Sequence, residues 1–272
     1  LVEDPVAFEW SADGCLWVAE MRDYPLGLDA QGKPGGRIKR LKDIDSDGIY
    51  DEAEIFLDDI PFPSGLYPWE NGLWISAAPY VFFAADLDGD GKADMRRNLL
   101  SGFGEGNQQH RVNGFNYGLD HWLYGANGDS GGEIESLWSE QTWDLRRKDF
   151  RFNPVTGEFQ TLEGQTQFGR NRDDWGNWFG NNNPNWLWHY HFPERYTSQS
   201  TSTDYGSNKI QLAADVESKR VNQIAPSLQR FNDVGLRGHV TSACSATPYR
   251  DTLLFDDDHQ HMFVSEPVHN LV

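Results

Sequence analysis

The acidic residues that begin at position 43 have the spacing of a calcium-binding loop. Acids occupy loop positions 1, 3, 5, 9 and 12, and Gly48 occupies position 6. In EF-hand-type loops this pattern surrounds Ca²⁺ with carboxylates and one backbone carbonyl, while the glycine permits the sharp turn. The predicted ligands are Asp43, Asp45, Asp47, the carbonyl of Ile49, Asp51 and Glu54.

A second, shorter copy of this loop begins 43 residues later. It keeps the acids at positions 1, 3, 5 and 9 and Gly91 at position 6, but Arg97 stands at position 12. No convincing helix flanks either loop, so both are predicted to be hairpin loops in which the ion neutralises clustered carboxylates and stiffens a long turn. An acidic, solvated turn without an ion is the alternative. The predicted ligands of the second loop are Asp86, Asp88, Asp90, the carbonyl of Lys92 and Asp94.

Histidine is the other residue type whose position suggests chemistry. His110 lies in a loop just before a predicted strand, and an imidazole there is a natural general base near neutral pH. A structural role for His110 is the alternative. Two further histidine pairs alternate along predicted strands, so each pair would lie on one strand face and could bind zinc or another transition metal. This set comprises His189, His191, His259, His261, His269 and Glu266.

The elements that must hold these residues are short β-strands. Apolar or alternating runs bounded by Gly, Pro, Asn or Asp recur along the chain and are enriched in aromatic and β-branched residues. The predicted strands are Ala7–Trp10, Leu16–Glu20, Arg37–Leu41, Gly72–Ala77, Val81–Ala85, Gly114–Tyr117, Trp122–Ala126, Asp149–Asn153, Trp186–Tyr190 and Met262–Ser265. One or two helical turns are expected at most, within Asn208–Val221.

One pattern occurs three times, in Phe8–Met21, Tyr67–Ala78 and Phe115–Asp129. Each copy has a strand, a turn rich in Asp, Asn or Gly, and an aromatic–aliphatic strand that ends in small residues. This is the inner hairpin of a propeller blade, and recurrence at about 40–50 residues is typical of β-propellers. We therefore predict an all-β fold, a β-propeller with four or five blade-like units in a single domain over residues 1–272. A β-sandwich is the alternative.

The composition limits the classes of partner. A formal net charge of −19 repels nucleic acid and anionic membranes, and it suits the binding of hard cations. Aromatic residues make up 14% of the chain, which argues against disorder; most rings are predicted in the core, and exposed ones would suit stacking on sugars. Residues from about Gln165 to Ser207 are dense in Asn, Trp, His and Arg and include a polar loop, Thr197–Ser207; such long loops are usually functional or mobile.

The cysteines and the chain ends leave several questions open. Cys15 and Cys244 fit a long-range disulfide and two free thiols equally well, and no CxxC motif occurs. No apolar run reaches transmembrane length, so no transmembrane segment is predicted in this chain. No signal peptide is visible and neither end looks like a natural terminus, so the chain is predicted to be a mature chain or a fragment of a longer one.

Several long motifs resemble those of the membrane-bound dehydrogenase family of planctomycetes and verrucomicrobia. They include RIKRLKDIDSDGIYDEAEIF, IPFPSGLYPWENGLWISAAP, TQFGRNRDDWGNWFGNNNPNWLWHY and GHVTSACSATPYRD, and the resemblance extends over nearly the whole chain. That family is similar to the PQQ-dependent soluble glucose and sorbosone dehydrogenases, which are six-bladed propellers. The resemblance therefore implies a propeller of the six-bladed type, which this chain need not complete by itself.

The resemblance also implies a reaction and residues for it. In the related dehydrogenases a histidine before a strand pair takes the proton of the sugar hydroxyl while hydride passes to PQQ. His110 fits that place, and Asp129 closes the motif. Arg170 and Asn171 are the candidates for contact with the quinone. A further Ca²⁺ would polarise PQQ, a cytochrome c would accept the electrons, and the protein would be periplasmic or extracellular.

Three functions compete on these grounds. The first is a PQQ-type dehydrogenase of the cell envelope that oxidises a sugar or an alcohol, which requires a funnel where His110 and arginine side chains converge. The second is a calcium-binding propeller that binds glycans or proteins without a reaction, which predicts aromatic side chains around a groove. The third is a metal-dependent, lactonase-like hydrolase, which needs a central divalent ion. The fold alone does not decide among them.

Overall fold

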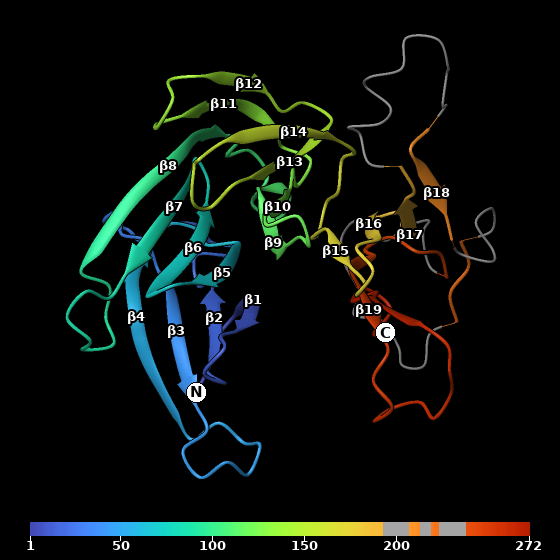
Figure 1. Ribbon diagram of the computed structural model, residues 1–272, viewed down its shortest axis with the longest axis horizontal. Coiled ribbons are helices and arrows are strands. Elements are labelled where there is room, and N and C mark those ends of the chain that lie inside the picture. The colour runs from blue at the N-terminus through green and yellow to red at the C-terminus, as the bar shows by residue number, and fades with distance from the viewer. Residues whose placement is uncertain (193–206, 213–218, 223–237) are drawn as a thin grey trace.

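The chain forms a series of antiparallel sheets arranged like the blades of a β-propeller (Figure 1). The computed structural model describes residues 1–192, 207–212, 219–222 and 238–272. Within these residues there are four sheets of four or more strands and one sheet of two strands. The predicted all-β propeller fold is confirmed, and closure of the ring into six blades stays a prediction.

The five sheets follow one another along the chain, except that one hairpin of the second sheet is inserted between strands of the third. Blade 1 contains β1 (Pro5–Trp10), β2 (Leu16–Glu20), β3 (Gly36–Lys42) and β4 (Glu52–Ile60). Blade 2 contains β5 (Gly65–Trp69), β6 (Gly72–Ala77), β7 (Tyr80–Ala85) and β8 (Met95–Phe103), and the hairpin of β11 (Gly132–Ser136) and β12 (Thr142–Asp144) extends it. Blade 3 contains β9 (Asn113–Tyr117), β10 (Leu123–Ala126), β13 (Lys148–Phe152) and β14 (Phe159–Glu163). Blade 4 contains β15 (Asn171–Arg172), β16 (Trp178–Asn182), β17 (Asn185–Tyr190) and β18 (Lys209–Gln211), and blade 5 contains β19 (Cys244–Tyr249) and β20 (His261–Ser265).

The pattern that occurs three times in the sequence is the inner hairpin of the first three blades. Its copies form the hairpins β1–β2, β5–β6 and β9–β10. The innermost strands lie against their neighbours, since β1 contacts β5, β5 contacts β9, and β15 contacts β19. The sequence repeat therefore corresponds to the structural repeat.

All ten predicted strands are present, whereas several outer strands were missed. The outer strand β4 exposes acidic residues and buries only Phe56 and Ile60 fully, so it lacks the apolar run that marks β6, all six residues of which are buried. The prediction of helical turns within Asn208–Val221 was wrong for the start of that stretch, where Lys209–Gln211 form the strand β18. Residues of β18 pair with β17 there, with Ile210 opposite His189. The predicted polar loop Thr197–Ser207 lies outside the described residues except for its last one.

Apolar packing lies between blades rather than within them. One cluster joins blades 1 and 2 through side chains such as Ile38 and Phe82. A second joins blades 2 and 3 through residues such as Trp74 and Phe150, and a third joins blade 4 to Ala246 of blade 5. Each inner strand is therefore covered on both faces, which explains its nearly continuous apolar sequence.

Glycines allow the innermost strands to approach one another closely. A Cβ on Gly65 would lie 2.9 Å from the backbone nitrogen of Gly114, and a Cβ on Gly114 would lie 2.3 Å from the Cα of Gly169. Asn113 joins the same segments, because its side chain accepts the N–H of Gly169 (2.8 Å) and donates to the carbonyl of Gln167 (2.7 Å). Blades 2, 3 and 4 are thus fixed together at their inner edge.

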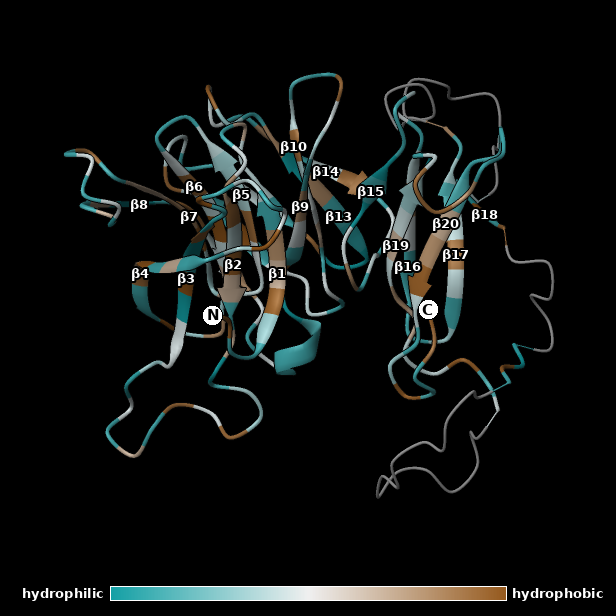
Figure 2. Ribbon diagram, turned by 90° about the horizontal axis from the view of Figure 1, so that it is seen from below, coloured by the Kyte–Doolittle hydropathy of each residue, from teal (hydrophilic) through white to brown (hydrophobic). Residues whose placement is uncertain are grey.

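The connections between strands alternate between two faces, because successive strands of a blade are antiparallel. The His110 face carries the connections 104–112, 127–131 and 164–170. The opposite Asp-loop face carries the first Asp loop (43–51), the second Asp loop (86–94) and the turns 118–122 and 173–177. In Figure 2 the short 3₁₀ turn that precedes β9, η1 (Gln108–His110), lies beyond the lower ends of the central strands, on the His110 face.

Two further predictions concern the thiols and the membrane. Cys15, buried just before β2, and Cys244, in β19, are both free thiols. Burial raises the pKa of the Cys244 thiol. Among the described residues, no helix is long and apolar enough to cross a membrane.

The close approach of the inner strands predicts a strong effect of one methyl group. Gly114→Ala places a Cβ against the Gly169 backbone at a residue with φ of 62°, so we expect a loss of about 2 kcal/mol or more in the free energy of unfolding. Urea denaturation measures it. Gly106→Ala is the matched control, because nothing lies within 4 Å of its Cβ position. Equal stability of the two variants would contradict the described packing.

Candidate functional site

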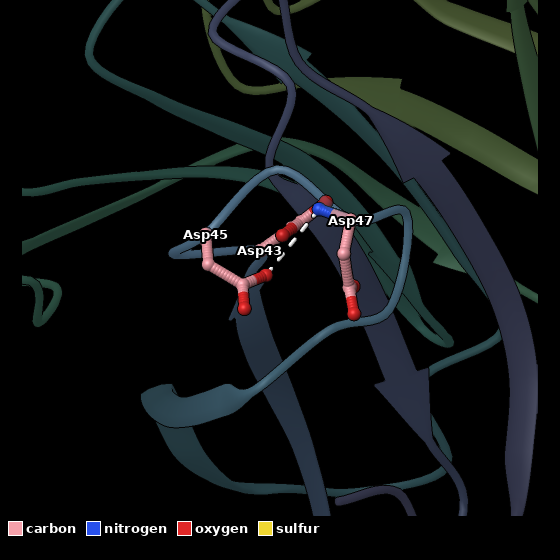
Figure 3. Close-up of side chains that lie close together, drawn as sticks. All are labelled: Asp43, Asp45 and Asp47. Atoms are coloured by element: carbon pink, nitrogen blue, oxygen red, sulfur yellow. Dashed lines mark hydrogen bonds between the residues drawn. The ribbon is translucent and has the colours of Figure 1, made fainter.

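The first Asp loop closes on itself through its first acid. The Asp43 carboxylate accepts the backbone N–H groups of Ser46 (2.7 Å) and Gly48 (2.9 Å). Ser46 and Gly48 both have positive φ, 61° and 89°, as a tight turn requires. Figure 3 shows Asp43, Asp45 and Asp47 gathered in the loop, with the N–H of Asp47 donating to Asp45.

The second Asp loop repeats the same hydrogen bonds in equivalent positions. The Asp86 carboxylate accepts the N–H groups of Gly89 (2.6 Å) and Gly91 (2.9 Å). These donors, that of Gly91 above all, hold the pKa of Asp86 below its ordinary value. At position 9, Asp94 accepts the N–H of Leu87, as Asp51 accepts the N–H of the equivalent residue in the first loop. The acids therefore shape the turn in both loops.

Each loop brings three carboxylates within reach of one cation. Within each group the ligand atoms lie within 4.8 Å of one another, and the described residues contain no third group of His, Cys, Asp and Glu of this kind. Ca²⁺ takes six to eight oxygen ligands, so carbonyl and water oxygens would complete either site. The two groups are Asp43, Asp45 and Asp47, and Asp86, Asp88 and Asp94. Of the other predicted side-chain ligands, Asp51 and Asp90 lie outside these groups and accept backbone N–H groups.

Two of the predicted ligands are backbone carbonyls, and the nitrogens of the same residues are hydrogen bonded. The N–H of Ile49 donates to Asp47, and the N–H of Lys92 donates to Asp90, both at 2.8 Å. The two loops therefore agree at this position as well. These bonds hold positions 5 and 7 of each loop together.

Glu54 does not close the first loop as a twelfth-position ligand in this structure. Its carboxylate pairs with Lys42 at 2.7 Å, and a Cβ on Gly91 would lie 3.3 Å from it. Ala93 of the second loop also donates its N–H to the carbonyl of Phe56 in β4, at 2.8 Å. Glu54 thus lies beside the second Asp loop, which rests against blade 1.

His110 ends a single 3₁₀ turn, η1 (Gln108–His110), on the His110 face. The Asn107 side chain caps this turn by accepting the N–H of Gln109 at 3.0 Å. The carbonyl of His110 accepts the N–H of Ser130 at 3.0 Å. The imidazole is half-buried and makes no hydrogen bond with the described residues. Its nitrogens are therefore available to another molecule.

Asp129 reaches the same face from the end of β10. Its carboxylate accepts the Gln165 side-chain amide at 2.9 Å. Gly128 lies directly under the preceding loop, since a Cβ there would lie 1.9 Å from the carbonyl of Arg111. The structure therefore brings the backbones at His110 and Asp129 together, while the side chain of Asp129 is held by Gln165.

Arg170 and Asn171 are neighbours in sequence with different surroundings. The Asn171 side chain donates to the carbonyl of Ala246 (2.8 Å) and accepts from the Asn116 amide (3.2 Å), so it joins the innermost strands of three blades. Arg170 is buried, and its guanidinium lies 3.4 Å from the Asp149 carboxylate between blades 3 and 4. Only Asn171 of the predicted pair lies at the inner edge.

The predicted histidine cluster does not gather into a metal site. His189 stacks on Phe179, and desolvation by burial, followed by the nearby His191, lowers its pKa. His269 and Glu266 are buried together, 3.1 Å apart, and Glu266 also accepts two backbone N–H groups. His191 and His259 lie just outside β17 and β20, so neither predicted pair lies within one strand, and the histidines of blades 4 and 5 have separate partners.

A buried polar network lies between blades 3 and 4, where the ring of Tyr124 also stacks on that of Trp178 with their centroids 3.9 Å apart. The Asp149 carboxylate is fully buried and accepts the N–H groups of Asn127 (3.0 Å) and Thr166 (2.9 Å). The Tyr190 hydroxyl lies 3.4 Å from it, and burial together with the Asp149 charge raises the pKa of Tyr190. This interface is therefore held by hydrogen bonds.

A cavity of about 660 Å³ lies at this interface and was not predicted. It extends to the turns 118–122 and 173–177 of the Asp-loop face. Aromatic and polar side chains share its lining, among them Asp120, Tyr124, Arg151, Trp175, Trp178 and Arg170. The density of Trp and Asn in residues 165–207 was the available signal, but it did not identify the partners from blade 3.

Comparison with solved structures gives only distant likenesses. The PQQ domain of pyranose dehydrogenase from Coprinopsis cinerea is 14% identical, with a TM-score of 0.43 over 68% of this chain and 46% of that chain. A luciferin-regenerating enzyme is 12% identical, with a TM-score of 0.40 over 67% of this chain and 52% of that chain. The chain thus spans about half the length of these two structures.

The remaining comparisons concern curated proteins and protein families. None of the curated proteins matches the chain. One family model does match it, over residues 1–272, and that family is described as a domain of unknown function, DUF7133. The match covers every residue of the chain. The chain therefore belongs to the DUF7133 family.

Proposed function

We propose that the chain forms the propeller part of a cell-envelope dehydrogenase of the PQQ type that oxidises a sugar or an alcohol. The observation that supports this most is the convergence of three loops on the His110 face. Ser130 donates to the His110 carbonyl (3.0 Å), and Gly128 donates to the Thr166 carbonyl (3.0 Å). The sequence resemblance assigns its reactive residues to the same three loops and to the start of β15, which follows the third loop.

His110 is the proposed general base. Its imidazole has no hydrogen-bond partner among the described residues, so accepting a proton from a substrate hydroxyl requires no bond to be broken first. A neutral imidazole suits this role near neutral pH. Asp129 lies on the adjoining loop, and Gln165 holds it in place. Its proposed part is to position the loop beside His110.

PQQ, when bound, would supply the acceptor for hydride. The predicted contacts fit it only in part. Asn171 lies at the inner edge, where its amide is ordered by two hydrogen bonds, and it remains the candidate to hold the quinone. Arg170 does not fit, because it is buried against Asp149 and lines the cavity between blades 3 and 4. We therefore assign Arg170 no part in holding PQQ.

We also propose that each Asp loop binds one Ca²⁺. The same hydrogen-bond pattern occurs in both loops, and each holds three carboxylates within 4.8 Å. Both loops lie on the face opposite His110, so these ions would stiffen the hairpins β3–β4 and β7–β8 rather than take part in the reaction. Beyond these two loops, the described residues contain no other cluster of three His, Cys, Asp or Glu side chains of this kind.

The other two functions differ in their support. A calcium-binding propeller that binds glycans or proteins without a reaction is the second candidate, because the cavity between blades 3 and 4 has the expected aromatic lining. A metal-dependent hydrolase needs a central ion, and no observation on the described residues favours one. For the dehydrogenase, a periplasmic or extracellular location and a cytochrome c partner belong to the proposal.

Reconstitution tests the proposed reaction. The chain is loaded with calcium and PQQ, and dye reduction is measured over a panel of sugars and alcohols. We expect PQQ-dependent turnover that His110→Ala lowers by about 100-fold or more. His259→Ala is the control, because His259 is an exposed histidine in the connection between β19 and β20 and belongs to none of the three loops of the His110 face. The proposal fails if folded, calcium-loaded protein shows no turnover, or if His110→Ala matches the control.

Calcium binding is tested by thermal unfolding. At a calcium concentration of about 100 times the dissociation constant, each site should add about 2.7 kcal/mol to the stability of the folded chain. We expect Asp43→Ala and Asp86→Ala each to remove about half of the calcium-dependent rise in Tm, since each removes a ligand of one of the two proposed calcium sites. Asp256→Ala changes an exposed acid outside both loops and should keep the full rise. An unchanged Tm on adding calcium would contradict both sites.

A further inference from the structure

We propose that the cavity between blades 3 and 4 binds a neutral saccharide, at a site separate from the His110 face. Its volume of about 660 Å³ falls within the range of roughly 300–1,000 Å³ that is usual for small-molecule sites. The cavity combines aromatic rings with carboxylate, guanidinium and amide groups. A saccharide offers matching surfaces, because its C–H face is apolar and its rim carries hydroxyl donors and acceptors.

Trp175 provides a prearranged aromatic surface at the edge of this cavity. Its side chain is 62% exposed, although an indole of this size normally packs away from water. Asp173 fixes the turn by accepting the N–H of Trp175 at 3.0 Å. The Arg250 guanidinium lies 4.1 Å from the indole ring, and Arg250 is in turn ion-paired with Asp174. The ring is therefore held in place while much of it faces solvent.

Polar groups from blade 3 line the same cavity as Trp175. One oxygen of Asp120 accepts both Arg151 Nη1 (2.6 Å) and the Tyr124 hydroxyl (2.9 Å). The other oxygen of Asp120 is buried beside Gly118 without a partner among the described residues, so a ligand would meet the partly exposed Arg151–Asp120 pair, whose side chains are 14% and 29% exposed. Arg151 also donates to Gln160 at 2.7 Å. The carboxylate, guanidinium and amide groups of this lining can accept hydrogen bonds from the hydroxyls of a saccharide or donate hydrogen bonds to them.

The charges of the lining favour a neutral ligand over an anionic one. Arg151 is neutralised by Asp120, and Arg170 lies against the buried Asp149. An acidic sugar or a phosphate would therefore compete with existing ion pairs, and it would also approach a chain with a net charge of −19. A neutral saccharide needs only hydrogen bonds and stacking, which the described lining supplies.

The test is titration of the full chain with neutral trisaccharides, in which tryptophan fluorescence and calorimetry measure the binding. The probes are cellotriose, maltotriose, xylotriose and N,N′,N″-triacetylchitotriose, with trigalacturonate as the anionic comparison. We expect at least one neutral probe to bind, and Trp175→Ala to weaken that binding tenfold or more. Trp10→Ala is the control, because Trp10 is similarly exposed, at 57%, but belongs to blade 1. His110→Ala should bind the probe normally, which separates this site from the proposed reaction.

Any of the following results would overturn the proposal. The first is that no neutral probe binds to chain shown to be folded by circular dichroism. The second is that Trp175→Ala binds as well as Trp10→Ala does. The third is that trigalacturonate binds more tightly than every neutral probe, or that His110→Ala loses the binding. A failure of PQQ-dependent turnover would leave these results unaffected.

Discussion

The close approach of three glycines at the inner edge is the constraint on which the rest of the structure depends. Gly65, Gly114 and Gly169 bring the backbones of blades 2, 3 and 4 into contact that a single Cβ would prevent. Because the loops before β9 and β15 end at these contacts, their positions are fixed relative to each other. The proposed base, His110, belongs to the first of these loops, and the proposed quinone contact, Asn171, is the first residue of β15.

The blades are joined in two physically different ways. Apolar side chains fill the interfaces of blades 1 and 2, and of blades 2 and 3. Between blades 3 and 4 the buried Asp149 carboxylate gathers backbone and side-chain donors instead. A cavity of about 660 Å³ lies beside this polar network. The separation of the two faces follows from the antiparallel order of the strands.

The sequence was most informative for features that depend on residues close together in the chain. The Asp loops and the inner hairpins depend on residues within one turn or two strands, so spacing and periodicity were enough to predict them. Arg170 was placed with Asn171 because they adjoin, but adjacent residues of extended chain point to opposite sides, and only Asn171 lies at the inner edge. Glu54 and the cavity depend on contacts between blades, for which a single sequence gives no pairing signal.

The central claim is that reaction and stability belong to opposite faces of this propeller. A crystal structure of the chain grown with calcium and PQQ tests it most directly. The account predicts calcium ions in the two Asp loops and the quinone on the face that carries His110 and Asn171. Quinone bound in the cavity beside Arg170, or Asp loops left empty at saturating calcium, would contradict it.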